Sequence, residues 1–366
     1  MQPFRINVPK ETLDDMRDRL ARTRWPDEIE GSGWSYGTNL EYLRELVEYW
    51  RAGFDWRAAE AAINRWPQFA ADIDGLKIHF IHQRGSGPSP APLLITHGWP
   101  SSFVEMFEIL PLLAESFDVV VPSLPGCAFS QTGPGLSKHR IAALWAKLMQ
   151  KLGYDRFFAH GGDIGAGVTS RLALLAPERV RAIHVTSAIP PYLGPGSAPL
   201  SDAEKAFVSC EQQWLRDEGG YIAIQNTRPQ TLAYGLNDSP AGLTAYIIEK
   251  FRAWSDCGGD VESRFTKDHL LTNVMIYWVT QTIGSSMRLY YENRVKPNGL
   301  RRGERIEVPS AVALTVEPVD RSPREWAQRS YNLRHWTQFP RGGHFIAMEE
   351  PALLAQDIRE FFGRYL

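Results

Sequence analysis

The segment that most constrains this chain is residues 157–167, where an apolar, strand-like stretch passes into a helix-like stretch through small residues. Asp163 stands at the point of this turn, here called the elbow, with Gly161 and Gly165 two residues before and after it. Such a turn holds its central residue in a strained backbone conformation, and side chains at the flanking positions would collide with it. The pattern predicts that Asp163 is presented as a nucleophile at the end of a strand.

The chemistry of the elbow depends on Asp163 being a carboxylate. The usual residue is serine, which transfers acyl groups, whereas a carboxylate attacks an electrophilic sp3 carbon and forms an alkyl ester. A dinucleotide-binding loop is disfavoured, because G-x-G-x-x-G does not follow the strand directly and no acidic residue stands at the ribose position. A structural helix N-cap stays open, and only partners elsewhere in the chain can exclude it.

A candidate general base lies near the end of the chain. His344 follows two glycines and precedes Phe345, in a loop between the last predicted strand and a helix opened by Glu349-Glu350-Pro351. The order of nucleophile, acid and histidine is that of the α/β-hydrolase architecture. A histidine in such a loop is hard to explain as core filling, so His344 is predicted to be the base. Structural roles are expected for the histidines in strand-like runs or at a helix start: His79, His82, His184 and His139.

A loop upstream of the elbow offers hydrogen-bond donors. Residues 92–96 predict a buried strand, and His97-Gly98-Trp99-Pro100 follows as a tight loop. In α/β-hydrolases this loop and the residue after the nucleophile each give a backbone N–H to the oxyanion hole. Trp99 and Ile164 are therefore the predicted donors. Taken alone, the loop is better explained as an ordinary turn.

Together these motifs resemble the microsomal-type epoxide hydrolases. The resemblance covers nearly the whole chain and includes family-like strings at residues 4–9, 20–26, 66–69, 218–225 and 235–240. It implies a cofactor-independent enzyme that converts an epoxide and water to a vicinal diol. It also implies that the chain is a soluble, bacterial-type member with a long N-terminal extension.

The resemblance further implies two lid tyrosines that grip the epoxide oxygen. Tyr221, in Gly219-Gly220-Tyr221, matches one and Tyr290 matches the other. Two phenol donors in a dry pocket stabilise the alkoxide that develops as the ring opens. The competing interpretation is that both tyrosines pack at a domain interface. Tyr291 follows Tyr290 directly and would point elsewhere on a helix.

The orienting acid departs from the family pattern. Counting from the strand that starts at Val308-Pro309, or back from residues 323–326, places the family's Asp or Glu at Pro318. Proline cannot orient an imidazole. Glu317 is the first candidate and Asp320 the second, and the displacement puts the rate of ester release in doubt more than the type of reaction.

Strand-like and helix-like segments alternate from about residue 70, which predicts a mostly parallel sheet covered by helices, an α/β-hydrolase fold. A hairpin turn is expected at Asp74-Gly75. Residues 11–24 and 40–50 have helical spacing and are expected to embrace the core. The predicted organisation is an N-terminal extension wrapping the core over 1–70, the core over 71–190, a helical lid over 191–295 and the rest of the core over 296–366.

Net charge and cysteine content limit the expected partners and the cellular compartment of the protein. The formal net charge is −2, so neither nucleic acid nor an anionic membrane is an expected partner. Cys127, Cys210 and Cys257 are widely spaced without CxxC or metal-ligand clustering, which favours a reducing cytosol and indicates no metal. The N-terminus turns charged by Lys10 and has no apolar anchor, so a cytoplasmic protein is expected, with a homodimer left open.

The expected substrate is a small apolar or aromatic epoxide, with water as the second reactant. Four tryptophans fall in loop or lid regions expected to face the pocket: Trp99, Trp214, Trp254 and Trp278. Most tryptophans are core or interface residues, so the pocket role is assigned only to Trp99, whose loop is placed by the motif. Detoxification and biosynthesis both fit these residues. A haloalkane-type dehalogenase would have tryptophan directly after the nucleophile, where this chain has Ile164. A non-catalytic binding homologue is the other alternative, and only the displaced acid favours it.

Overall fold

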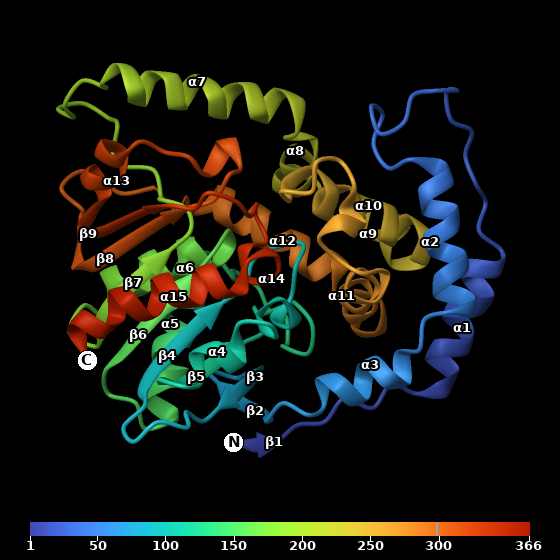
Figure 1. Ribbon diagram of the computed structural model, residues 1–366, viewed down its shortest axis with the longest axis horizontal. Coiled ribbons are helices and arrows are strands. Elements are labelled where there is room, and N and C mark those ends of the chain that lie inside the picture. Colours follow the sequence, from blue (N-terminus) through green and yellow to red (C-terminus); the bar gives the residue numbers. More distant parts are fainter. Residues whose placement is uncertain (298) are drawn as a thin grey trace.

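A β-sheet runs through the middle of the protein (Figure 1). The structure is a computed structural model that describes residues 1–297 and 299–366, and within them the sheet has nine strands. The strands are β1 (Gln2–Pro3), β2 (Gln68–Ile73), β3 (Leu76–Gln83), β4 (Ala91–Thr96), β5 (Phe117–Pro122), β6 (Phe157–Gly161), β7 (Val180–Val185), β8 (Ile306–Leu314) and β9 (Tyr331–Gln338).

The strand order is β1-β2-β3-β5-β4-β6-β7-β8-β9. The pairs from β1 to β5 are antiparallel, and those from β5 through β4 to β9 are parallel. Every residue of β5 and β6 is buried, as expected for central parallel strands covered on both faces. The expected hairpin joins β2 to β3, with φ of 52° at Asp74 and 77° at Gly75. The mostly parallel α/β sheet is confirmed.

Helices cover the sheet. α6 packs along β4, β6, β7 and β8 and contacts α5, while α15 packs on β7 and contacts α4. α4, α5, α6 and α13 each follow one parallel strand and lead to the next, as the alternating sequence pattern predicts. Their bounds are α4 (Leu110–Leu113), α5 (Lys138–Lys151), α6 (Ile164–Leu175), α13 (Arg324–Ser330), α14 (Ile346–Glu349) and α15 (Pro351–Phe362).

Between β7 and β8, the described residues form helices and no strand. We call these the lid helices: α7 (Asp202–Asp217), α8 (Gly220–Thr227), α9 (Pro229–Asp238), α10 (Pro240–Trp254), α11 (Lys267–Thr280) and α12 (Ile283–Val295). Local signals start them: Ser201 and Glu204 form a capping box at α7, and Ser239 caps α10 just before Pro240. Figure 1 shows α7 along the top of the molecule, with α8 to α11 extending to one side of the sheet.

The N-terminal helices α1 (Lys10–Ala21), α2 (Leu40–Ala52) and α3 (Trp56–Ile63) form where their spacing predicts. Their helix–helix contacts outside the extension are with the lid, α1 and α2 on α10 and α2 and α3 on α11, and the wrapping of the core by residues 1–70 stays a prediction. Apolar spacing shows which face of a helix is buried and does not identify what covers it. The extension reaches the sheet through β1 and through Phe4, whose ring lies 4.8 Å from that of His79.

The three cysteines, Cys127, Cys210 and Cys257, are free thiols. Among the residues that the structure describes, no helix combines the length and the apolar character needed to span a bilayer. The domain boundaries at 70, 190 and 295 stay predictions.

Candidate active site

The elbow has the strained backbone that its sequence predicts. Asp163 joins β6 to α6 with φ 51° and ψ −122°, a region that residues with side chains rarely adopt. Close packing explains the glycines around it. A Cβ on Gly165 would lie 2.0 Å from the carbonyl oxygen of Thr96, and one on Gly98 would lie 2.5 Å from Cβ of Asp163. The absence of side chains at these positions lets the end of β4 approach the elbow.

The Asp163 carboxylate lies between a backbone donor and an imidazole. The Trp99 N–H donates to Oδ1 at 2.9 Å, and Nε2 of His344 lies 3.6 Å from Oδ2. Within the described residues the side chain makes no capping hydrogen bond to α6, so an N-cap role does not account for it. The side chain retains 21% exposure, which leaves the carboxylate accessible to a small reactant.

Both predicted oxyanion donors are next to this carboxylate. The N–H of Trp99 already points at it, and the peptide bond between Trp99 and Pro100 is cis. Ile164 is the first residue of α6, where the N–H groups of the first turn have no acceptor within the helix. A negative oxygen on the Asp163 carbonyl carbon would meet preorganised donors here.

Contacts from two directions fix the loop that carries Trp99. The His97 side chain bonds the carbonyl of the next residue through Nδ1 at 2.8 Å and accepts the N–H of Leu124 at Nε2 at 3.1 Å. Burial lowers the pKa of His97 to about 4, so this imidazole is a neutral structural group. From lid helix α11, Asn273 donates to the Pro100 carbonyl at 2.8 Å.

Each ring nitrogen of His344 lies next to an acidic side chain. Nδ1 lies 3.0 Å from Oε2 of Glu317 and 3.8 Å from Oδ2 of Asp320, while Nε2 faces Asp163. Burial opposes protonation of the imidazole, but the negative charges of Glu317, Asp163 and Asp320 outweigh burial and raise the pKa of His344 to about 10. The shorter contact favours Glu317 as the orienting acid.

Asp320 is a second carboxyl group in the same corner, with 13% of its side chain exposed. Burial, followed by the negative charge of Glu317, raises the pKa of Asp320 above its usual range. Oδ2 of Asp320 accepts from the Thr315 hydroxyl at 3.3 Å. Glu317, Asp320 and His344 offer ligand atoms within 4.8 Å of one another, a spacing that a divalent cation could also use.

The two predicted tyrosines meet above Trp99. Tyr221 of α8 stacks on Trp99 with ring centroids 5.4 Å apart, and Tyr290 of α12 meets Trp99 edge-on at 5.7 Å. Their own rings are 5.9 Å apart. Burial is the main cause that raises the pKa of both hydroxyls well above 10, with the charge of Asp163 adding to it, so both stay protonated donors. Tyr291 is 38% exposed and lies outside this group.

Two of the predicted tryptophans join the same ring cluster. The Trp254 ring lies 5.1 Å from that of Tyr221 and 5.1 Å from that of His344, and Trp214 lies 6.4 Å from Tyr221. Trp278 is placed differently: its ring lies under the Arg19 guanidinium of α1, 5.9 Å from the centroid. The expectation that Trp278 faces the pocket therefore needs correction, because α11 turns this residue toward the N-terminal helices.

A buried lysine beside the ring cluster was not predicted. Nζ of Lys250 in α10 lies 5.1 Å from the ring centroid of Tyr221 and 5.6 Å from that of Trp254, and it pairs with Glu249 at 2.6 Å. Only 8% of the lysine side chain is exposed. A single lysine in an amphipathic helix has no sequence signature that separates it from a surface charge.

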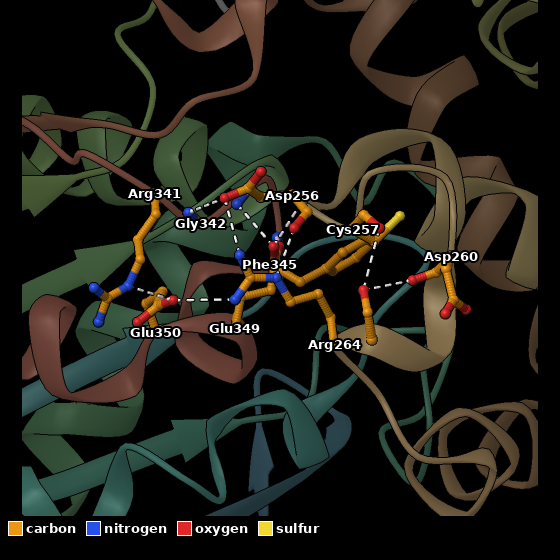
Figure 2. A network of polar contacts seen from close by, with 11 residues as sticks. Asp256, Cys257, Asp260, Arg264, Arg341, Gly342, Phe345, Glu349 and Glu350 are labelled. Atoms are coloured by element: carbon orange, nitrogen blue, oxygen red, sulfur yellow. Dashed lines mark hydrogen bonds and ion pairs between the residues drawn. The ribbon is translucent and has the colours of Figure 1, made fainter.

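The loop that carries His344 is tied to the lid segment that follows α10 (Figure 2). Asp256 accepts the Gly342 N–H at 3.0 Å and pairs with Arg264 at 3.0 Å. Arg264 also pairs with Glu350 at 3.1 Å. The sequence analysis missed this network because it joins two segments, 256–264 and 342–350, whose paired residues are 86 positions apart. The signal that the sequence did offer was the acidic pair at 349–350, directly after the histidine loop.

Comparisons with known proteins agree with this geometry. Residues 1–106 match the family model described as epoxide hydrolase N terminus, and residues 91–217 match the α/β hydrolase fold. A Stigmatella aurantiaca protein, whose name marks it as a proposed epoxide hydrolase, is 42% identical over 98% of this chain and 84% of its own length. Epoxide hydrolase 1 of Sus scrofa is 37% identical over 99% of this chain and 88% of its own.

Solved structures give the same result. The juvenile hormone epoxide hydrolase of the silkworm Bombyx mori superposes with a TM-score of 0.90 at 31% identity, covering 100% of this chain and 94% of that one. The expectation of an enzyme that acts on epoxides is confirmed at the level of the family. The chain belongs to the epoxide hydrolase family of the α/β-hydrolase superfamily.

Proposed function

We propose that the protein hydrolyses epoxides through a covalent ester on Asp163. An Asp163 carboxylate oxygen attacks one epoxide carbon, and the bond from that carbon to the ring oxygen breaks. The hydroxyls of Tyr221 and Tyr290 stabilise the resulting alkoxide, which takes a proton from one of them, and that phenol regains a proton from solvent. The product of this half-reaction is a hydroxyalkyl ester of Asp163.

The second half-reaction releases the diol. His344 removes a proton from water, and the oxygen of this water attacks the ester carbonyl carbon of Asp163. The N–H groups of Trp99 and Ile164 stabilise the tetrahedral oxyanion. Its collapse expels the diol alkoxide, which takes the proton from His344, and the regenerated Asp163 carboxyl group ionises.

Ester formation also prepares the base for its task. In the free protein the charges of Glu317, Asp163 and Asp320 raise the pKa of His344 to about 10, which favours the imidazolium. The ester of Asp163 is neutral, so alkylation removes one of these charges and lowers the affinity of His344 for its proton. The imidazolium then passes its proton to solvent, and the neutral imidazole acts as the base in ester hydrolysis.

One observation supports this proposal above all. His344 Nε2 lies 3.6 Å from the Asp163 carboxylate, while Nδ1 lies 3.0 Å from Glu317. That arrangement joins a nucleophile, a base and an orienting acid through the two nitrogens of one ring, as the two half-reactions require. Neither a capping role for Asp163 nor packing of the aromatic rings would require this arrangement of the three side chains.

The ring cluster supports an apolar or aromatic epoxide as the substrate. The cluster of packed rings next to the nucleophile consists of Trp99, Tyr221, Trp254 and Tyr290, and aromatic side chains bind flat apolar groups well. A cytoplasmic location and a homodimer are further parts of the proposal, the first supported by the reduced cysteines. Cell fractionation tests the location, and the size of the purified protein in solution tests the homodimer.

A single turnover in 18O-labelled water tests the covalent route. With protein in excess over styrene oxide, the first diol formed should contain no 18O, because its new oxygen comes from Asp163. The peptide that contains Asp163 should gain the label instead. Direct attack of water on the epoxide would put 18O into the first diol and refute the proposal.

The same assay separates the two alternatives. Chloride release from a chloroalkane, without diol from styrene oxide, would make the protein a dehalogenase. Neither product nor covalent adduct, over a panel of small and polycyclic epoxides, would favour a binding protein.

A further inference from the structure

Glu349 is a buried carboxylate whose two oxygens accept backbone N–H groups from two separate loops. Oε2 accepts from Gly343 at 2.9 Å and from Asp256 at 2.8 Å, and Oε1 accepts from Phe345 at 3.0 Å. Gly343 and Phe345 flank His344, whereas Asp256 belongs to the lid segment after α10. Glu349 therefore connects the loop of the catalytic base to the lid.

The lid satisfies the remaining N–H groups of the base loop. The Gly342 N–H donates to Oδ2 of Asp256 at 3.0 Å, and the His344 N–H donates to the Trp254 carbonyl at 2.8 Å. Each N–H from Gly342 to Phe345 thus has an acceptor supplied by Glu349 or by the lid segment. A loop with every donor bound in this way has little freedom to shift.

Close packing at Gly343 makes the contact specific. A Cβ at this position would lie 2.5 Å from the Trp254 carbonyl oxygen and 2.6 Å from the Asp256 nitrogen. The backbones of the two loops touch directly, and no side chain separates them. Displacement of the lid segment would therefore displace the backbone that sets the position of the imidazole.

We propose that Glu349 and Asp256 are positioning residues for ester hydrolysis, and that through them the lid holds His344 in place for the second half-reaction. This inference rests on the proposed function. Hydrolysis needs the imidazole aligned with both water and the ester carbonyl. Ring opening uses Asp163 and the two tyrosines, none of which belongs to the base loop, so it does not need Glu349.

Glutamine at position 349 is the sharpest probe because it keeps the size of the side chain. A carboxylate has two acceptor oxygens, while the amide has one and would turn an NH2 group toward a backbone N–H. At least one of the three bonds would be lost, and the loop would move. Since a misplacement of about 1 Å costs about 100-fold in rate, Glu349→Gln should slow ester hydrolysis by roughly 10- to 100-fold.

The experiment follows both half-reactions with styrene oxide in single turnovers, using rapid quenching and mass analysis of the Asp163 peptide. In Glu349→Gln the ester should form at the parent rate, decay slowly and accumulate. The matched control is Glu360→Gln, which changes an exposed acid of α15. Among the described residues Glu360 pairs with Arg364 at the surface and belongs to no contact of the base loop or of Asp256, so this variant should release the ester at the parent rate.

A second variant keeps the test valid if Glu349→Gln does not fold. Asp256 is one-third exposed (34%), and Asp256→Ala removes the acceptor of the Gly342 N–H without opening the core. It too should slow ester decay and leave ester formation unchanged. Parent rates of decay in the variants that fold, or equal loss of both half-reactions, would overturn the positioning role.

Failure of the two proposals can be told apart. If the unaltered protein forms no ester on Asp163, the proposed function itself fails, and the positioning role with it. If the ester forms and all variants clear it at the parent rate, only the role of Glu349 and Asp256 is lost.

Discussion

Nδ1 of His344 lies 3.0 Å from Oε2 of Glu317, although Glu317 precedes by one residue the position where the family's acid is expected, which is Pro318 here. The extra methylene of glutamate, compared with aspartate, supplies reach from the earlier position. The 3-10 turn Pro318–Asp320 then brings Asp320 to the same nitrogen at 3.8 Å. The displaced acid thus keeps the contact through a longer side chain.

Separate replacement of these two acids should identify the partner of His344. Glu317→Gln should slow ester hydrolysis strongly, on the order of 100- to 10,000-fold, the range seen when an orienting carboxylate is lost from a triad. Asp320→Asn should have a smaller effect, because its contact with Nδ1 is longer. Ester decay measured in single turnovers checks this, and a larger loss in Asp320→Asn would reverse the assignment.

Asp163 and His344 should fail at different steps. Asp163→Asn should form no ester, because the amide is a poor nucleophile, whereas His344→Gln should form the ester and retain it. Mass analysis of the peptide with Asp163 after incubation with an epoxide distinguishes these states. Equal residual turnover in both variants would contradict separate roles for the two residues.

Loss of a tyrosine hydroxyl should slow ring opening. Tyr221→Phe and Tyr290→Phe should each reduce the rate of ester formation by roughly 10- to 1000-fold, the size expected for losing one donor to a developing oxyanion. Tyr291→Phe is the matched control, since this neighbouring ring is 38% exposed and lies outside the cluster. An effect of Tyr291→Phe as large as that of Tyr290→Phe would show that the assignment is one residue off.

The raised pKa of His344 predicts how its contribution to stability changes with pH. Its pKa is about 10 in the folded protein and about 6.5 in an unfolded chain, so the folded state binds the proton more tightly. The stabilisation is fully present at a pH below the pKa of the unfolded state and is lost as the pH rises through the pKa of the folded state. The difference in Tm between the parent and His344→Gln should therefore shrink between pH 6.5 and 10. A constant difference would exclude a raised pKa.

Metal chelation should leave the activity unchanged. Glu317, Asp320 and His344 have the spacing of a metal site, yet the proposed chemistry needs their hydrogen bonds and a free imidazole nitrogen. Extensive dialysis against EDTA, followed by a diol assay, is the measurement. Loss of turnover that added Mg²⁺ or Zn²⁺ restores would assign a metal to this corner.

The parts of the fold and site that the sequence predicted are those governed by local rules. The elbow follows from Gly161, Asp163 and Gly165 because sharp turns tolerate few residues, and the hairpin at Asp74 follows for the same reason. Alternating apolar segments predicted a mostly parallel sheet correctly. Family resemblance named Tyr221 and Tyr290, which lie on separate lid helices, α8 and α12, and meet at Trp99.

What the sequence could not predict depends on distances through space. The choice between Glu317 and Asp320 turns on less than 1 Å at one nitrogen, which no spacing rule resolves. The contacts of the N-terminal helices with the lid and the placement of Trp278 depend on which surfaces meet. Glu349 ends the short helix α14 and Asp256 lies in a loop, positions where acids are commonly solvent-exposed, and only their bonds to backbone N–H groups distinguish them.

The direct backbone contact between Gly343 and the segment 254–256 also bears on how this protein could be engineered. Libraries that randomise this segment to admit bulkier epoxides should mostly yield variants that remain alkylated after one cycle. Mutagenesis directed at α8 and α12 is the safer route to a wider substrate range, because those helices hold the tyrosines and leave the histidine's supports intact.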